Sequence, residues 1–243
     1  DFPAVYDMLS RMKAKLDAGR AILYQTARYV DIYKALDDIA RERKLTPEER
    51  AEQKKYTRLA DAFTPLAKGM NSEYANQNAY DAIQIHGGSG FIMEYKSQRL
   101  YRDARIFSIY EGTTQLQVVA AIRYITNGTY LSIMKEMMER PICECAAPMR
   151  ERIAKLIEQY EDALNYVKEQ GNQDLQDFLA RRLYEMTADI IMSLLLLEDA
   201  TRAPELFKKS INVFLRHAEA ECTAHHAYIK AFTAEDLENF RAR

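Results

Sequence analysis

Long stretches of this chain contain neither glycine nor proline, and this feature limits the possible folds more than any other. The 243 residues include eight glycines and six prolines. The stretches between them are rich in Ala, Leu, Glu, Lys, Arg and Met, the residues with the highest helix propensity. The sequence therefore predicts an all-α protein.

The first part of the chain predicts two long helices. Apolar residues recur at steps of three and four from Val5 to Tyr33, which places them on one helix face and predicts a helix ending near Lys44. The run Thr46-Pro47-Glu48-Glu49 has the elements of a capping box and predicts the start of a second helix. This helix should extend to about His86, bent or interrupted at Pro65.

Three of the eight glycines lie within residues 87–90, where they should end the second helix. Two shorter helices are expected over roughly residues 96–105 and 114–125. The run Thr126-Asn127-Gly128-Thr129 is a strong break, and we predict a domain boundary near residue 130. The two predicted domains are therefore residues 1–130 and 131–243.

The second domain is predicted to be an antiparallel helical bundle. Apolar residues with helical spacing cover residues 149–167 and 175–197, and a third helix is expected over 206–232 after Pro204. Amphipathic helices joined by short links bury their apolar faces against one another. A helix near residues 131–138 would complete the bundle.

Charge and composition exclude several classes of protein. Residues 1–130 carry 19 basic and 16 acidic residues, and residues 131–243 carry 15 and 20, so neither half has the basic excess typical of nucleic-acid binding. Apolar runs are too short to cross a bilayer, and no targeting peptide is visible. Three cysteines without framework spacing, with Cys143-Glu144-Cys145 interpreted as incidental, indicate a reducing compartment, which we take to be the cytoplasm.

The most specific pattern is Ile109-Tyr110-Glu111-Gly112-Thr113-Thr114-Gln115. Removal of a proton next to a thioester carbonyl needs a carboxylate at that carbon and donors near the carbonyl oxygen. Glu111 is a candidate for the first task and its backbone amide for the second. Gly112 has no side chain to block an acyl group, and Thr113 or Thr114 is a suitable helix cap. The alternative interpretation of Glu111 alone is a solvated charge at a helix start.

Two further blocks precede this pattern in a fixed order, namely Gln84-Ile85-His86-Gly87-Gly88-Ser89-Gly90-Phe91 and Tyr101-Arg102-Asp103-Ala104-Arg105. Together the three blocks resemble the flavin and active-site segment of acyl-CoA dehydrogenases. The resemblance implies FAD-dependent α,β-dehydrogenation of an acyl-CoA thioester, with Glu111 as the base and Gly112 against the acyl-CoA. It also implies that FAD contacts Thr113, Thr114 and Gln115, and that Gln84, Ile85, His86, Gly87 and Gly88 lie along the FAD of a neighbouring subunit.

The resemblance covers roughly residues 1–130, which correspond to most of the family's C-terminal helical domain. The family's amino-terminal helical domain and middle β domain have no counterpart, so the chain is predicted to be a C-terminal fragment that is inactive alone. Residues 131–243 resemble the additional helical domain of longer members. The resemblance also implies a homodimer or homotetramer and an electron-transferring flavoprotein as the electron acceptor.

Several alternatives remain at this level. The chain could be a non-dehydrogenase flavoprotein homologue with a nucleic-acid or damage-response role, which its charge disfavours, or a helical oligomerisation module. His86 is equally compatible with a core or capping histidine. The residues His217, Glu221 and His225 have a spacing that can bind a metal on one helix face, but no second ligand-bearing helix is evident. We therefore expect a hydrogen-bonded structural role for His225 and no metal.

Overall fold

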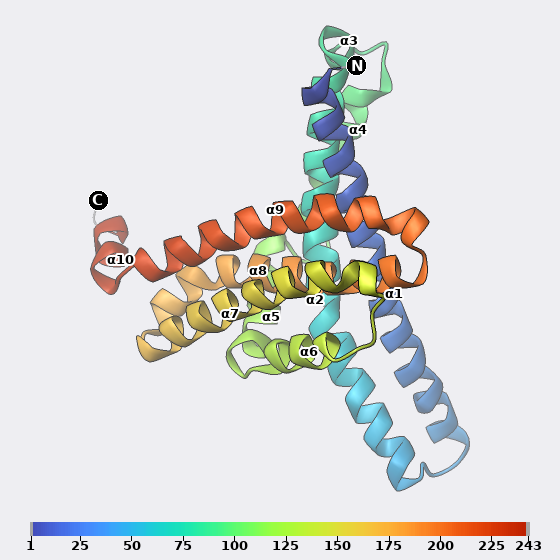
Figure 1. The fold of residues 1–243 in the computed structure, drawn as a ribbon. Helices are drawn as coiled ribbons and strands as arrows, with labels where there is room; N and C mark the ends of the chain where they lie inside the picture. The colour runs from blue at the N-terminus through green and yellow to red at the C-terminus, as the bar shows by residue number, and fades with distance from the viewer. Residues whose placement is uncertain (1, 242–243) are drawn as a thin grey trace.

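The computed structural model describes residues 2–241, without the side chain of Cys145, and every regular element in that range is helical (Figure 1). The prediction of an all-α protein is confirmed. Two long helices form an antiparallel hairpin that extends through the whole molecule, and a bundle of later helices crosses it (Figure 1).

The hairpin consists of α1 (Pro3–Glu42) and α2 (Pro47–His86). The predicted capping box is present: the hydroxyl of Thr46 accepts a hydrogen bond from the amide of Glu49, and the carboxylate of Glu49 accepts one from the amide of Thr46. The predicted interruption at Pro65 is wrong, because α2 is continuous through this residue. Pro65 is buried, and its carbonyl accepts a hydrogen bond from the hydroxyl of Tyr184.

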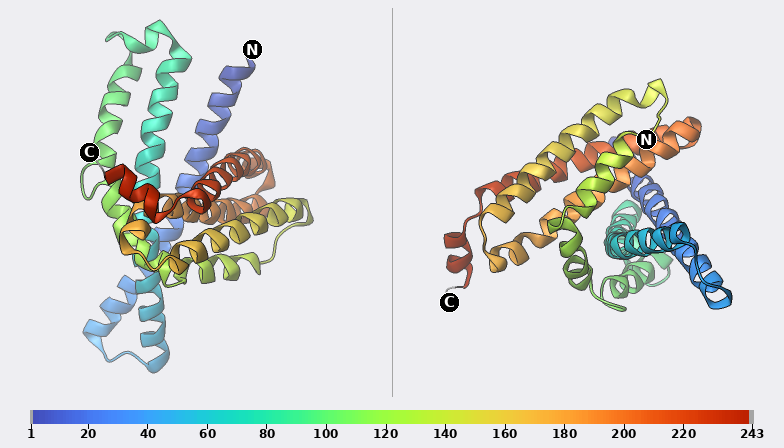
Figure 2. Two further views of the ribbon diagram at one scale, coloured as in Figure 1. Left: turned by 90° about the vertical axis from the view of Figure 1, so that its left-hand side faces the viewer. Right: turned by 90° about the horizontal axis from the view of Figure 1, so that it is seen from below.

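Short elements follow the hairpin and return along α2. They are α3 (Gly88–Phe91), α4 (Lys96–Ala104), the 3-10 helix η1 (Arg105–Ser108), α5 (Thr114–Thr126) and α6 (Thr129–Met138). Figure 2 shows α4 beside the last turns of α2, with which it is in contact. The predicted helices over 96–105 and 114–125 correspond to α4 and α5. The loop between η1 and α5 therefore lies beside the middle of α2.

The crossing bundle begins after the 3-10 helix η2 (Glu144–Ala146) and contains α7 (Ala147–Glu169), α8 (Gln173–Arg202) and α9 (Pro204–Ala231), followed by α10 (Ala234–Arg241). The three long helices contact one another, and α8 and α9 also contact α1. Nearly every residue of α8 between 183 and 200 is buried, as expected for a helix that is apolar on all sides. This helix is the centre of the molecule.

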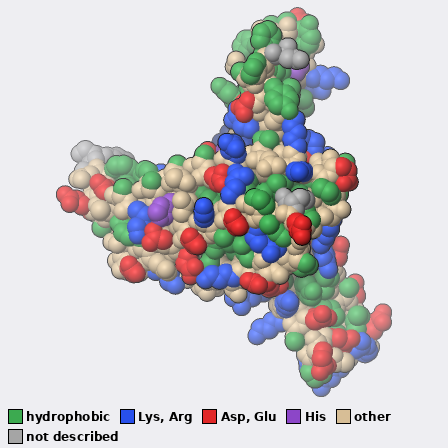
Figure 3. All heavy atoms as spheres, in the orientation of Figure 1, with side chains coloured by type: hydrophobic (Ala, Val, Ile, Leu, Met, Phe, Trp, Pro, Cys, Tyr) green, Lys and Arg blue, Asp and Glu red, His purple; other side chains and the backbone are tan. Residues whose placement is uncertain are grey.

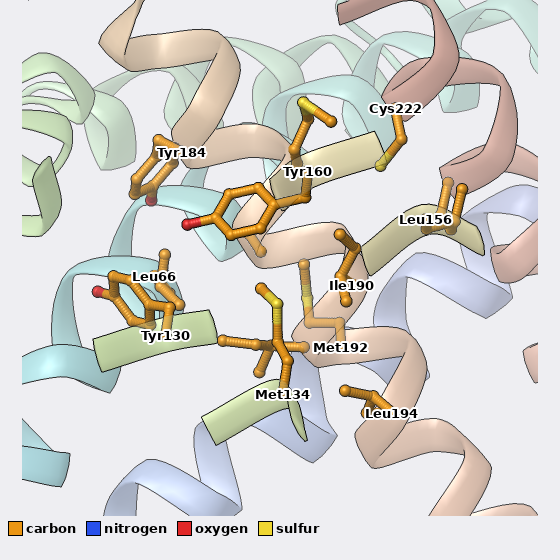
Figure 4. Close-up of a cluster of buried hydrophobic side chains, with 14 of the residues drawn as sticks. Leu66, Tyr130, Met134, Leu156, Tyr160, Tyr184, Ile190, Met192, Leu194 and Cys222 are labelled. Carbon is orange, nitrogen blue, oxygen red and sulfur yellow. The ribbon is translucent and has the colours of Figure 1, made fainter. Parts of the chain in front are cut away.

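One hydrophobic core joins the hairpin and the bundle. Figure 4 shows side chains of α2, α6 and α8 within a single buried cluster, including Leu66, Tyr130, Met134 and Tyr184. The hydroxyl of Tyr130 donates a hydrogen bond to the carbonyl of Ala62 on α2. Tyr130 and Tyr184 therefore satisfy their buried hydroxyl groups on backbone carbonyls of α2.

The structure corrects the sequence-based interpretation of the cysteines. Cys222 is a buried free thiol, whereas Cys143 is disulfide-bonded, so the interpretation of this cysteine as incidental is wrong. None of the described helices combines the length and the apolar character that crossing a lipid bilayer requires.

Candidate active site

The loop between η1 and α5, residues 109–113, carries Glu111 and is called the base loop below. Its backbone adopts an uncommon conformation. Glu111 has a φ of 50° and is the only described non-glycine residue with positive φ, and Gly112 follows with a φ of 88°. Non-glycine residues in this region are strained and occur often at functional sites. A side chain at Gly112 would also place its Cβ 2.8 Å from Nε2 of Gln117. The loop therefore needs glycine at this position.

Two side chains hold this loop against α2 and α5. Nζ of Lys68 donates hydrogen bonds to the carbonyls of Gly112 (2.6 Å) and Phe107 (2.8 Å), and Nε2 of Gln117 donates to the same Gly112 carbonyl (3.2 Å). The Lys68 ammonium also lies 5.7 Å from the ring centroid of Tyr110. Hydrogen bonds from a charged donor are about twice as strong as neutral ones. These contacts fix the backbone on both sides of Glu111.

Glu111 itself lies at an open cleft of about 490 Å³ between the hairpin and the loop. Among residues 2–241, none forms a hydrogen bond or ion pair with its exposed carboxylate. Its backbone amide likewise has no hydrogen-bond partner in that range. The cleft combines the carboxylate with apolar and small polar side chains of α1, α2 and the loop: Leu23, Thr26, Thr64, Ala67, Lys68, Asn71, Ser72, Ala75, Phe107 and Tyr110.

The first residues of α5 have different environments. The hydroxyl of Thr113 caps the helix by accepting a hydrogen bond from the amide of Leu116 (3.2 Å). Thr114 is buried, and its hydroxyl donates to Oε1 of Glu73 on α2 (2.6 Å). Gln115 is exposed. Because Thr114 is turned inward, its side chain is not available to a ligand, whereas the backbone amides of Thr114 and Gln115 have no partner among the described residues.

The glycine loop lies at the end of α2. Gln84, His86, Gly87 and Gly88 are exposed, and Ile85 is partly buried. Nδ1 of His86 donates a hydrogen bond to the carbonyl of Ala82 one turn earlier (2.7 Å). This contact supports the helix-capping interpretation of His86.

The three glycines of this loop differ in their surroundings. Gly87 has a φ of 60°, and neither it nor Gly88 has another atom within 4 Å of the position of a Cβ. Gly90 is different, because its Cβ would lie 2.6 Å from the carbonyl oxygen of Ile83. The loop is therefore closely packed at one glycine and open at the other two.

The structure does not bring the two predicted groups together. Lys68 contacts the base loop, whereas Gly87 follows the end of the same helix, about 28 Å further along at 1.5 Å per residue. Gln84 to Gly88 therefore form one exposed surface, and Glu111 to Gln115 form another. The sequence did not indicate that the base loop is held by Lys68, Gln117 and Glu73. Each is an ordinary polar residue within a helix, and no motif marks it.

A separate polar cavity of about 280 Å³ lies between α2, α8 and α9. The predicted His217, Glu221 and His225 line it, with Met70, Glu73, Tyr74, Gln77, Arg181, Glu185 and Asp189. Nε2 of His225 lies 3.1 Å from Oε2 of Glu185. Among the described residues, no group of three or more His, Cys, Asp or Glu side chains is arranged to hold a metal ion. His225 is paired with the carboxylate of Glu185 on α8, which agrees with the polar, structural contact expected for it.

Comparisons with known proteins define the class. A family model described as acyl-CoA dehydrogenase, C-terminal domain, matches residues 1–125, and a second, described as acyl-CoA dehydrogenase C terminal, matches residues 126–237. The chain therefore belongs to the acyl-CoA dehydrogenase family. A solved acyl-CoA dehydrogenase complexed with FAD from Bacillus anthracis has the same fold, with a TM-score of 0.70 at 21% identity over 98% of this chain and 44% of that one.

Two curated relatives are more similar in sequence over a shorter stretch. The caffeyl-CoA reductase-Etf complex subunit CarC of Acetobacterium woodii is 37% identical over 117 residues, which are 48% of this chain and 24% of that protein. The 3-methylmercaptopropionyl-CoA dehydrogenase of Ruegeria pomeroyi is 41% identical over 116 residues, which are 47% of this chain and 18% of that protein. The matched region therefore spans a quarter or less of either relative.

Proposed function

We propose that this chain forms the C-terminal part of an FAD-dependent acyl-CoA dehydrogenase that carries out α,β-dehydrogenation of an acyl-CoA thioester, with Glu111 as the base. The observation that carries the proposal is the unpaired carboxylate of Glu111 at an apolar cleft, on a loop with strained and firmly held backbone. A carboxylate in this setting is free to accept a proton from a substrate. The family membership supports the reaction class.

The residues of this chain have distinct roles in the proposed reaction. Glu111 takes the proton from the carbon next to the thioester carbonyl. Its backbone amide is free to donate to the carbonyl oxygen, where negative charge develops. Gly112 leaves room for the acyl group, and Lys68 keeps the loop in position without pairing with the carboxylate.

The residues of the two surfaces fit parts of a flavin cofactor. The backbone amides of Thr114 and Gln115 point out of the start of α5 and suit polar or anionic groups, and Thr113 retains a hydroxyl hydrogen to donate. The open space at Gly87 and Gly88 lets another molecule approach the backbone closely. When bound, FAD would accept the β-hydrogen as hydride. We propose that the glycine loop, with Gln84, Ile85 and His86, contacts the FAD of a second subunit.

The same proposal includes assembly and partners. The tip beyond the glycine loop exposes large apolar side chains, among them Phe91 (77% exposed) and Met93 (86%), and Figure 3 shows this projection as largely hydrophobic. Exposed patches of this kind favour association, which supports a homodimer or homotetramer. We propose an electron-transferring flavoprotein as acceptor, supported by the Etf complex of the Acetobacterium woodii relative.

We also propose that residues 1–130 and 131–243 have different roles and that the chain is inactive alone. Glu111 lies at a cleft that is open to solvent, whereas proton abstraction next to a carbonyl benefits from a closed, water-free site. Further protein segments would have to cover the cleft before the reaction could proceed efficiently. The first segment would carry the base, and the second would support it.

The test is anaerobic titration of the intact FAD-containing protein with acyl-CoA esters of different chain lengths, following loss of the oxidised-flavin absorbance. We expect reduction by one class of ester, and Glu111→Gln should slow it by about 10²- to 10⁴-fold, the usual contribution of a general base. The control is Glu139→Gln, which changes an exposed glutamate elsewhere. No reduction by any ester, or full activity of Glu111→Gln, would refute the proposal.

A further inference from the structure

A continuous series of polar contacts connects the base loop with the last long helix. The hydroxyl of Thr114 at the start of α5 donates to Oε1 of Glu73 on α2 (2.6 Å). Oε2 of Glu73 lies 3.8 Å from Nη2 of Arg181 on α8. Nε of Arg181 donates to Oε1 of Glu185 (2.8 Å), whose Oε2 pairs with Nε2 of His225 on α9 (3.1 Å). The series therefore passes through four helices.

These groups are partly or fully shielded from water. Thr114 is 5% exposed, and the side chains of Glu73, Glu185 and His225 are 25%, 23% and 18% exposed, whereas the side chain of Arg181, which joins them, is 44% exposed. Burial alone would raise the pKa of Glu185, but hydrogen bonds with His225 and Arg181 outweigh burial and lower it. Shielded ion pairs are stronger than those on an open surface. Arg181 is the only described cation within reach of both Glu73 and Glu185.

The middle of α2 connects these polar contacts with the loop that carries Glu111. Glu73 of this helix contacts Thr114, and five residues earlier Lys68 donates to the carbonyl of Gly112. Gln117, one turn into α5, donates to that carbonyl as well. A shift in the first turn of α5 would therefore move the peptide that directly follows Glu111.

We propose that Arg181, held by Glu185 and His225, is a positioning residue: through Glu73 and Thr114 it fixes the start of α5 and thereby the orientation of Glu111. This inference rests on the proposed function of Glu111. It gives residues 131–243 a direct role in catalysis, since α8 and α9 both belong to that segment.

Removing the charge of Arg181 should disturb the start of α5 in the following way. Without the guanidinium, Glu73 and Glu185 would lose their shared cation, and two partly buried carboxylates would remain near each other. Like charges in such a setting disfavour each other. Glu73 would rotate toward solvent, and Thr114 would lose a charged acceptor. The first turn of α5 would then loosen.

The first measurement needs no activity. Hydrogen exchange of the backbone amides of Leu116 and Gln117, which donate to the hydroxyl and the carbonyl of Thr113, is compared between the unmodified chain and three variants: Arg181→Met, Arg181→Lys and Arg182→Met. Arg182 is the matched control because its guanidinium carbon lies 3.6 Å from the ring centroid of Tyr228, so it joins α8 to α9 without reaching Glu73. We expect faster exchange, about threefold or more, in Arg181→Met only, with rescue by Arg181→Lys, because opening of this turn would cost less.

The second measurement uses the intact protein with FAD. Arg181→Met should lower kcat by about tenfold with little change in KM, because small displacements of a catalytic group reduce rate more than binding. In a Glu73→Gln background, which keeps an acceptor for Thr114, Arg181→Met should have no further effect. If Arg181→Met alone fails to fold, the comparison of the double variant with Glu73→Gln still provides the test.

The outcomes separate the two proposals. Equal exchange and equal kcat in Arg181→Met and Arg182→Met would overturn the positioning role while leaving the role of Glu111 intact. Additive effects of Glu73→Gln and Arg181→Met would also overturn it. Full activity of Glu111→Gln would instead refute the proposed function itself, whatever the exchange data show.

Discussion

Gly69 lies where α2 packs against Tyr184 of α8 and Gln117 of α5. A Cβ at this position would lie 2.1 Å from the hydroxyl oxygen of Tyr184 and 3.4 Å from the Cβ of Gln117. The same Tyr184 hydroxyl donates to the Pro65 carbonyl at 2.8 Å. At this point α2 has no space for a methyl group unless the tyrosine moves and gives up its buried hydrogen bond.

We therefore predict that Gly69→Ala lowers the free energy of unfolding by about 2 kcal/mol, the range of overpacking in a close-packed core. Tyr184→Phe alone should cost about 1 kcal/mol, because the Pro65 carbonyl loses its side-chain donor. In the Tyr184→Phe background, Gly69→Ala should cost clearly less than it does alone. Urea denaturation of all four proteins checks this coupling, and strictly additive losses would contradict it.

Asp189 is a second residue whose effect on stability can be measured, because its pKa is raised in the folded protein. It is 4% exposed, and burial raises its pKa from 3.8 to about 7, although the hydrogen bond from Tyr74 acts in the opposite direction. The folded state therefore binds a proton more tightly than the unfolded state. Its contribution to stability is fully present below about pH 4 and is lost as the pH rises to about 7.

We predict that Asp189→Asn makes the protein more stable at pH 8 and removes part of this decline. One pKa unit corresponds to about 1.4 kcal/mol, so the gain at pH 8 should be on the order of 2–4 kcal/mol. Urea denaturation at several pH values between 4 and 8 measures it, with the exposed Asp61→Asn as a control for the charge change. A variant that is less stable than the original protein at pH 8 would contradict the sign.

Sequence reasoning located the candidate base but not the residues that hold it. Glu111 belongs to a local run of recognisable residues, whereas Lys68 and Glu73 contact the loop from positions about forty residues earlier. Nothing in the sequence around these residues marks them, because their effect depends on how α2 and α5 pack. The inward orientation of Thr114 was hidden for the same reason.

At the scale of elements, the α1–α2 hairpin depends on its turn. The capping box of Thr46 and Glu49 satisfies the first amides of α2, and Arg43 adds an ion pair to Glu49 at 2.6 Å. Helix-capping hydroxyls contribute about 1 kcal/mol. The end of this hairpin projects from the molecule with few neighbours (Figure 1), so its order depends mainly on such local contacts.

We predict that Thr46→Ala destabilises the hairpin end by about 1 kcal/mol. Hydrogen exchange of the first-turn amides of α2 should accelerate, while the buried amides of α8 should be unaffected. Thr57→Ala is the matched control, since the hydroxyl of Thr57 only returns to the carbonyl of Gln53 within the same helix, and alanine is the better helix former. Equal acceleration in both variants would show that the cap is unimportant.

Most helix starts with a local signal in the sequence were predicted, but one was missed. The capping box at Thr46 and Pro204 at the start of α9 gave correct starts. Pro65 was expected to bend or interrupt α2, and of these two outcomes the interruption is wrong, because the helix is continuous and the Pro65 carbonyl accepts a hydrogen bond from Tyr184. The short α10 was missed, although Thr233 and Asp236 form a reciprocal cap at its start, a signal that the sequence contained.

At the scale of the whole molecule, the proposed boundary near residue 130 divides roles but not the core. Tyr184 of the second segment donates to α2, and α8 contacts α1, α2 and α5. Buried side chains of both segments belong to one hydrophobic cluster. Either segment alone would expose the face that the other now covers, at a cost of about 25 cal/mol for each Å² of apolar surface.

We therefore predict a single cooperative unfolding transition for the chain, with the same midpoint by far-UV and near-UV circular dichroism. The sharper test is Leu66→Ala in the first segment, where Leu66 is fully buried. It should lower stability by about 2–5 kcal/mol and lower the protection of the slowest-exchanging amides of α8 by the same free energy. The exposed Leu206→Ala is the control. If α8 kept its protection while α2 lost its own, the two segments would unfold separately, and support of the base loop by the second segment would be weaker than proposed.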